Sequence, residues 1–380
     1  MKIRPLFIAS IIAAGILSGS NLRANLIASD EGVGSTMDWP NGTIDNLSEF
    51  IIGYSGPGIV RDFGADEVRV GLGIWQYNVF TVQNGSSVSS TGGIIGVGEE
   101  SGATAGGQNI IRVTGAGSTW TNSGSMVVIG GYSQFNQFYI ENHASVTSTT
   151  AVIGRGLEGY SAQGAYNMAA VRSGTWTISG ELTVGYHGRD NSLSIESGGK
   201  VSSASLTIGH GNDIGTGGMG STVYVTGSTS QLSVAGNVFL GKNASGVGVS
   251  GQNHLTATDG ALITIEGEIS FGDMGSLTNN FIVLDGGYIA LFGDQLTAVG
   301  QMITDGTIKI GSSWIDAEEG TNLLYDYFTT EETASEFAGG HENLSGYTIM
   351  KAHPNAVPEP STYALLALGA GAVLFFRRRN

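Results

Sequence analysis

Apolar and polar side chains alternate along most of the chain between residues 78 and 300, with a period of two residues. A period of two is typical of β-strands, whose successive side chains point to opposite faces, whereas an α-helix repeats every 3.6 residues. The alternation recurs in units of about 29 residues, most of which begin with asparagine. The eight units begin at Asn78, Asn109, Asn136, Asn167, Asn191, Ser221, Asn253 and Asn280.

Each unit predicts three short strands. The second and fourth positions after its start are apolar, as in Phe138 and Ile140, whereas the fifth position is polar in every unit. A second apolar site lies in the middle of the unit, where we assign Trp120 and Trp176 to the core. Most units end in a third strand followed by glycine, such as residues 206–209. Such short strands cannot bury their inner faces alone, so equivalent strands of successive units must stack.

Stacking one unit per coil predicts an all-β fold, a right-handed parallel β-helix (β-solenoid) of about eight or more coils. Coils roughly 4.8 Å apart would form a rod whose interior holds columns of valine, isoleucine and leucine. A single C-terminal hydrophobic helix completes the predicted fold. The 62 glycines and the 13% share of charged residues argue against a helical globular protein.

The asparagine that opens seven of the eight units predicts a structural column at one corner of the coil. Asparagine tolerates the left-handed backbone conformation of a turn, and stacked amides can hydrogen-bond to the coils above and below. The predicted column consists of Asn78, Asn109, Asn136, Asn167, Asn191, Asn253 and Asn280.

The two ends of the chain carry apolar segments. Lys2 and Arg4 precede an apolar run over residues 6–17, which is the layout of a secretory signal peptide. We expect cleavage after Ala24, with Ala28 as the second choice. At the other end, fourteen uncharged residues precede three arginines, which predicts a tail held in the membrane with its C-terminus in the cytoplasm.

These features predict six parts of the chain. We expect a signal peptide at 1–24, an N-terminal cap with irregular coils at 25–77 and the repeat solenoid at 78–300. A last coil and a C-terminal cap with a short helix follow at 301–352, then a linker with a Pro-Glu-Pro motif at 353–360, and a transmembrane helix with an arginine-rich tail at 361–380.

Val357, Pro358, Glu359 and Pro360, an apolar segment, and Arg377, Arg378 and Arg379 follow one another at the C-terminus. This order resembles the PEP-CTERM sorting signal of Gram-negative bacteria. The resemblance implies export by the general secretion machinery, transient anchoring in the inner membrane through the tail, and recognition by an exosortase that removes the tail near the Pro-Glu-Pro motif. It also implies a final place at the cell surface or in the extracellular matrix, associated with exopolysaccharide. The alternative is a tail that is kept as a permanent anchor.

The repeat unit is also similar to the repeats of autotransporter passenger domains and of PEP-CTERM proteins. Outside the predicted signal peptide and tail, the chain has 10 basic and 31 acidic residues, a net charge of about −21. We therefore expect no nucleic acid as partner, because binding to its backbone needs basic patches. The absence of cysteine excludes disulfides and a lipid anchor on cysteine.

Parallel β-helices include polysaccharide lyases and hydrolases, so a polysaccharide-acting enzyme is the alternative function. Such a site needs carboxylates, or carboxylates and a basic residue, that converge on one face. Glu141, Arg172 and Glu196 share one outward column and are the candidate trio. We interpret them as a surface charge ladder, and we expect no catalytic residue and a non-catalytic structural or adhesion-type protein.

Two further pairs of residues are candidates for binding. His187 and His210 follow the terminal glycines of adjacent units, so they are expected to face each other at one corner. Two ligands do not complete a metal site, and we expect neither a metal nor a cofactor. Tyr139 and Tyr224 occupy the outward third position after the unit start and are candidate glycan contacts through their aromatic rings.

Overall fold

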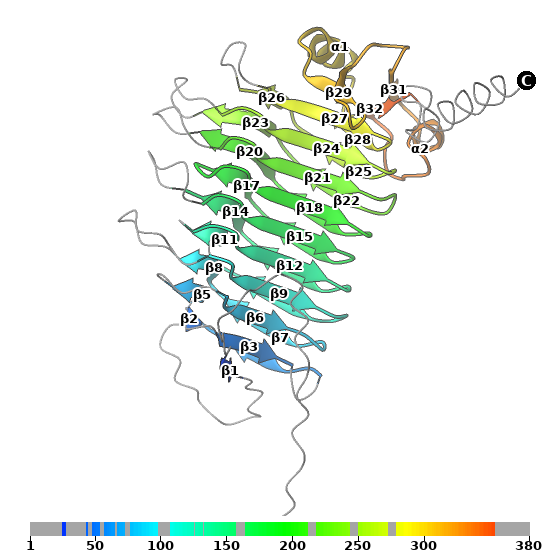
Figure 1. Cartoon of the computed structure of the whole chain (residues 1–380). Helices are drawn as coiled ribbons and strands as arrows, with labels where there is room; N and C mark the ends of the chain where they lie inside the picture. Colours follow the sequence, from blue (N-terminus) through cyan, green and yellow to red (C-terminus); the bar gives the residue numbers. More distant parts are fainter. Residues whose placement is uncertain are drawn as a thin grey trace, which may run out of the picture.

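The computed structural model is an all-β solenoid in which the repeats stack along one axis (Figure 1). The predicted signal peptide, the sorting motif and the tail helix lie outside the residues that the structure describes. The described residues are 25–27, 43–44, 48–53, 57–64, 67–72, 77–97, 107–124, 126–131, 133–156, 164–211, 218–243, 250–272 and 279–353.

Each coil contributes one strand to each of three sheets, here called A, C and B in the order in which the chain visits them. Sheet A contains β1 (Asn25–Ile27), β3 (Ser48–Ile52), β6 (Val79–Val82), β9 (Ile110–Thr114), β12 (Gln137–Glu141), β15 (Met168–Arg172), β18 (Ser192–Glu196), β21 (Thr222–Thr226), β24 (His254–Thr258), β27 (Phe281–Asp285), β29 (Ile308–Ile310) and β30 (Ile315–Asp316).

Sheets C and B form the other two sides of the coil. Sheet C contains β4 (Val60–Asp62), β7 (Ser87–Ser90), β10 (Thr119–Asn122), β13 (Ser145–Ser148), β16 (Thr175–Ile178), β19 (Lys200–Ser203), β22 (Gln231–Val234), β25 (Leu262–Ile265), β28 (Tyr288–Phe292), β32 (Tyr347–Ala352) and β31 (Leu323–Phe328). Sheet B contains β2 (Thr43–Ile44), β5 (Glu67–Leu72), β8 (Gly92–Val97), β11 (Met126–Gly131), β14 (Thr150–Arg155), β17 (Glu181–Tyr186), β20 (Ser205–Gly211), β23 (Val238–Asn243) and β26 (Ile269–Phe271).

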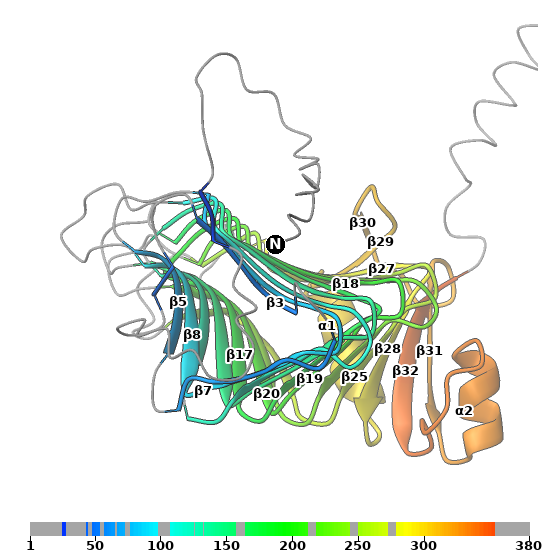
Figure 2. The same cartoon turned by 90° about the horizontal axis from the view of Figure 1, so that it is seen from below.

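Equivalent residues of successive repeats pair in parallel, one repeat to a coil. Phe138 pairs with Ile111 of the coil before and with Ala169 of the coil after. Seven repeats form complete coils, from β6–β8 to β24–β26, and β3, β4 and β5 make one more coil before them. Figure 2 views the solenoid from its N-terminal end. In this view the chain runs clockwise through sheets A, C and B as it moves away from the viewer, which is the sense of a right-handed coil. The predicted right-handed parallel β-helix is therefore confirmed.

The core is a set of apolar columns that the three sheets enclose. Trp120 and Trp176 are fully buried, and Phe138 lies between their rings with centroid distances of 5.8 and 5.2 Å. The indole N–H of Trp120 donates to Ser90 Oγ at 3.0 Å, and that of Trp176 donates to Ser148 Oγ at 3.2 Å. These bonds satisfy the only polar group of each ring, so the indoles fit a dry core.

The repeat pattern ends at the C-terminal end of the solenoid, which other elements cover. Residues 296–300, which the repeat would place in a third strand, begin the helix α1 (Leu296–Thr304), whose Val299 and Met302 are buried against the core. β32 pairs antiparallel with both β28 and β31, and β30 pairs antiparallel with β29. The helix α2 (Glu331–Phe337) packs against this end of sheet C through Ala334. These elements take the place of a further coil, so the apolar interior is covered.

Candidate functional site

The asparagines that open the repeats form one buried row beside sheet A. The backbone N–H and the side-chain Nδ2 of Asn136 both donate to Oδ1 of Asn167, each at 2.9 Å. Each amide thus satisfies the backbone and the side chain of its neighbour, which gives the row a structural role. The same pair of bonds joins Asn78 to Asn109, Asn109 to Asn136, Asn167 to Asn191, and Asn253 to Asn280.

The expectation that these asparagines adopt the left-handed conformation is wrong, because the preceding residue adopts it instead at six of the seven positions. The asparagine N–H points along the row to the next amide, so the reversal of the chain falls one residue earlier. The residues with positive φ are Tyr77, Gln108, Phe135, Tyr166, Asp190 and Gln252.

The glycine that ends the third strand makes room for the asparagine row. Gly154 has a φ of +78°, a conformation that side chains rarely adopt, and a Cβ at this position would clash with the side chain of Asn191. Gly130 faces Asn167 in the same way. The glycine that ends a repeat is therefore packed against the side chain that opens the second repeat after it.

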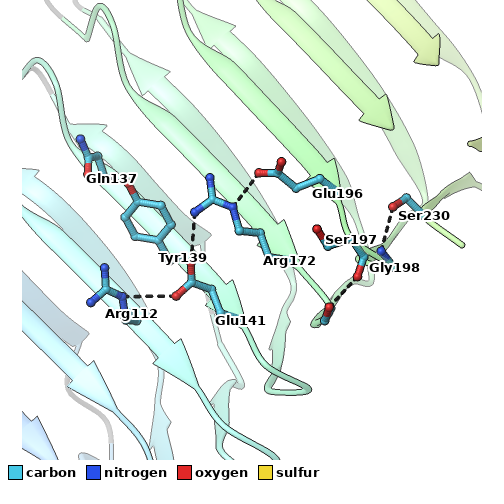
Figure 3. Close-up of polar contacts among 10 residues, drawn as sticks. Arg112, Gln137, Tyr139, Glu141, Arg172, Glu196, Ser197, Gly198 and Ser230 are labelled. Atoms are coloured by element: carbon cyan, nitrogen blue, oxygen red, sulfur yellow. Dashed lines mark hydrogen bonds and ion pairs between the residues drawn. The ribbon is translucent and has the colours of Figure 1, made fainter. Parts of the chain in front are cut away.

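Four charged residues alternate in sign across four coils of sheet A, as Figure 3 shows for Arg112, Glu141, Arg172 and Glu196. Arg172 donates to Glu196 Oε1 through Nε at 2.6 Å and to Glu141 Oε1 through Nη1 at 3.2 Å. Arg112 Nε lies 3.4 Å from Glu141 Oε2. The bond to Glu196, ahead of that to Glu141, raises the pKa of Arg172, so the guanidinium stays charged.

This geometry matches the predicted charge ladder better than it matches a glycosidase. A glycosidase places two carboxyl groups on either side of the scissile bond. Here the guanidinium of Arg172 occupies the space between Glu141 and Glu196, where a substrate would have to lie. The same three residues form a network of surface ion pairs, whose members are partly exposed.

The two tyrosines predicted as glycan contacts have different surroundings. The guanidinium carbons of Arg112, from the coil before, and Arg172, from the coil after, lie 5.2 and 5.5 Å from the ring centroid of Tyr139. Its hydroxyl donates to Gln137 Oε1 at 2.7 Å, and burial raises its pKa. Tyr224 is 39% exposed. Two cations therefore lie over the Tyr139 ring, and Tyr224 is the more accessible of the two tyrosines for a ligand.

His187 and His210 meet at one corner, with ring centroids 5.7 Å apart in an edge-to-face arrangement. Tyr186 stacks on His187 at 4.3 Å and meets His210 edge to face at 4.7 Å. Burial, then the neighbouring His187 and Lys242, lowers the pKa of His210. In the part of the chain that the structure describes, no group of three or more His, Asp or Glu side chains is arranged to hold a metal ion.

One aromatic cluster was missed by the sequence analysis. Trp314, in the turn between β29 and β30, lies 5.0 Å from the Phe281 ring and 4.7 Å from the His254 ring, and these two rings stack on each other at 4.1 Å. Burial lowers the pKa of His254 to about 4. The only signal in the sequence is a tryptophan outside the repeats, close to a glycine.

Residues 356–379 match the family model of the PEP-CTERM protein-sorting motif, which confirms the predicted sorting signal. The motif marks an exported protein that is transiently anchored in the membrane and is sorted by an exosortase. No curated protein and no solved structure matches the chain. None of the helices among the described residues is long and apolar enough to cross a membrane.

Proposed function

We propose that this exosortase substrate is a non-catalytic structural or adhesion-type protein that reaches the cell surface or the extracellular matrix and associates there with exopolysaccharide. The observation that carries the proposal is a sorting motif joined to a continuous β-solenoid. A rod of stacked coils presents long regular faces to a polymer.

The outer face of sheet C supports association with a hydrated polymer. One outward column of this sheet carries a hydroxyl in seven successive coils, so that it is uncharged in a strongly acidic protein. Serine and threonine hydroxyls both donate and accept hydrogen bonds, as sugar hydroxyls do. The column consists of Ser89, Thr121, Thr147, Thr177, Ser202, Ser233 and Thr264.

The proposed location is tested in the native host by fractionation and by intact mass of the mature protein. We expect a protein without its tail in the matrix fraction. Replacement of Pro358, Glu359 and Pro360 by alanine should leave the protein with its tail in the inner membrane, whereas Pro354→Ala, just outside the motif, should change nothing. An intact tail and an unchanged location in the triple variant would make the tail an ordinary permanent anchor.

The proposed partner is tested in a strain that makes no exopolysaccharide. Such cells should release the protein into the medium, because the polymer that retains it is missing. Retention in the same amount would contradict association with exopolysaccharide.

The non-catalytic role is tested with purified protein and a broad panel of polysaccharides. We expect no release of reducing ends and no formation of unsaturated products. Product formation that is lost in Glu141→Gln and Glu196→Gln would instead establish the alternative, a polysaccharide lyase or hydrolase.

A further inference from the structure

The fold holds Trp314 outward at the C-terminal end of sheet A. Its backbone has a φ of 53°, which is costly for a bulky side chain, yet 50% of its surface remains exposed. Figure 2 shows the β29–β30 hairpin that carries it projecting from sheet A. Strained backbone is frequent at binding sites, and here it holds a large ring that gains little burial.

The neighbours of Trp314 fix its ring and leave its polar group available. His254 and Phe281 form a stacked base against which the indole lies at interplanar angles of 67° and 66°. The indole N–H makes no hydrogen bond with any described residue, whereas those of Trp120 and Trp176 both donate inside the core. The indole of Trp314 is thus positioned like a binding residue and unlike a core residue.

An ion pair lies beside this ring. Lys309 and Asp316 are register partners in the β29–β30 hairpin, and their side chains form a salt bridge. Asp316 follows Trp314 by two residues in the sequence. The Asp316 side chain is 74% exposed. A carboxylate and an ammonium group at the rim supply an acceptor and donors for sugar hydroxyls.

Tyr224 lies on the same face of sheet A. It pairs with Thr256, which pairs with Val283, which in turn pairs with Lys309. Trp314 contacts His254 and Phe281, which belong to the first and second coils after that of Tyr224. With coils about 4.8 Å apart, the two exposed rings are separated by roughly 5–10 Å along the rod. One or two hexose residues span such a distance.

We propose that Trp314 and Tyr224 form a binding site for a neutral polysaccharide chain that runs along the rod at the C-terminal end of sheet A. Both rings contact the C–H faces of sugar residues, and the indole N–H, Lys309 and Asp316 bond to their hydroxyls. The net charge of about −21 outside the predicted signal peptide and tail opposes an anionic polymer. The inference rests on the proposed function, since it names the contact through which the protein holds exopolysaccharide.

The test is affinity electrophoresis of the protein purified from its native host, in gels that contain hydroxyethyl cellulose, galactomannan or alginate. We expect retardation by a neutral polymer and none by anionic alginate. Trp314→Ala and Tyr224→Ala should each raise the dissociation constant obtained from the retardation about tenfold. Phe292→Ala is the matched control, because Phe292 is an aromatic residue with 52% exposure that lies outside sheet A, and its binding should equal that of the wild type.

A second variant separates binding from stability. Trp314→Leu keeps an apolar cover over Phe281, so its melting temperature should stay near that of the wild type while its binding is lost. The neutral polymer should also shift the tryptophan emission of the wild type to shorter wavelength, and this shift should be absent in Trp314→Leu.

Two results would overturn the site. Equal retardation of the wild type and all variants would place the glycan contact elsewhere and leave the proposed association with exopolysaccharide intact. No retardation of the wild type by either neutral polymer would also overturn it. Release of the protein from cells without exopolysaccharide, measured separately, decides the proposed function itself.

Discussion

Ser221 stacks directly above Asn191 at the asparagine corner, yet their side chains do not hydrogen-bond. Asn191 Nδ2 and Ser221 Oγ are both buried and have no hydrogen-bond partner in the structure. The serine side chain is one bond shorter in reach than the amide that occupies this position in the neighbouring coils. The row of hydrogen-bonded side chains is therefore interrupted between Asn191 and Ser221.

Ser221→Asn should therefore stabilise the protein. The new Oδ1 would accept from Asn191 in the geometry that joins Asn167 to Asn191, where the backbone and side-chain bonds measure 2.9 and 3.2 Å. Two buried hydrogen bonds should add about 1–3 kcal/mol to the free energy of unfolding. Urea denaturation measures the shift in midpoint. Ser221→Ala is the control and should be nearly neutral, and a midpoint no higher than that of the wild type in Ser221→Asn would refute the argument.

Asn136→Ala should have the opposite effect. Asn136 Oδ1 accepts from the backbone N–H of Asn109 at 3.1 Å and from its Nδ2 at 3.0 Å. Truncation leaves both buried donors unpaired, at about 1–3 kcal/mol each. Asn237→Ala removes an amide that accepts one exposed bond, from the backbone N–H of Glu268 at 2.9 Å, and it should lower the urea midpoint far less. Equal losses in the two variants would mean that burial in the row confers no special stability.

The sequence carried enough information to predict the coil. Alternation with a period of two is read residue by residue, and stacking of identical units then determines which residues become neighbours. The register of Trp120 with Val88 and Val146 follows from that alignment alone. The meeting of His187 and His210 follows in the same way.

The structural features that the sequence did not predict depend mainly on contacts outside the repeat. Trp314 reaches His254 only because the hairpin folds back over sheet A, and no periodicity encodes that turn. The apolar residues at 296–300 fit a strand or a helix equally, and their helical form depends on the core that they cover. The contact of Tyr139 with Arg112 and Arg172 was not predicted, because the two arginines extend over its ring from outward positions two residues apart in their units. A pattern of apolar and polar positions does not show how far a side chain extends over its neighbours.

The charge ladder on sheet A should contribute modestly and in a salt-dependent manner. Arg172→Met leaves Glu141 and Glu196, which lie two coils apart, without the cation between them. Because the arginine side chain is 43% exposed, we expect a loss of about 1 kcal/mol or less at low salt and a smaller loss at 1 M salt. Melting temperatures at both salt concentrations measure this. Arg69→Met, which breaks a pair with a single carboxylate, Glu67, is the control and should have a smaller effect.

His254 should make the C-terminal end of the rod sensitive to acid. Burial lowers the pKa of His254 from 6.5 to about 4 in the folded protein, where its ring contacts those of Phe281 and Trp314. Between these two values the unfolded chain binds a proton that the folded protein does not bind. The contribution of His254 is therefore complete above about pH 6.5 and is lost as the pH falls towards 4, with a slope of up to about 1.4 kcal/mol per pH unit.

The measurement is the difference in melting temperature between pH 7 and pH 5. We expect this difference to be smaller in His254→Gln than in the wild type, because glutamine does not titrate, whereas His143→Gln, at an exposed turn, should behave as the wild type. The many carboxylates of the chain titrate in the same way in all three proteins, so the comparison isolates the histidine. An equal loss in the wild type and His254→Gln would show that the buried ring does not govern the acid response, and the carboxylates would then account for all of it.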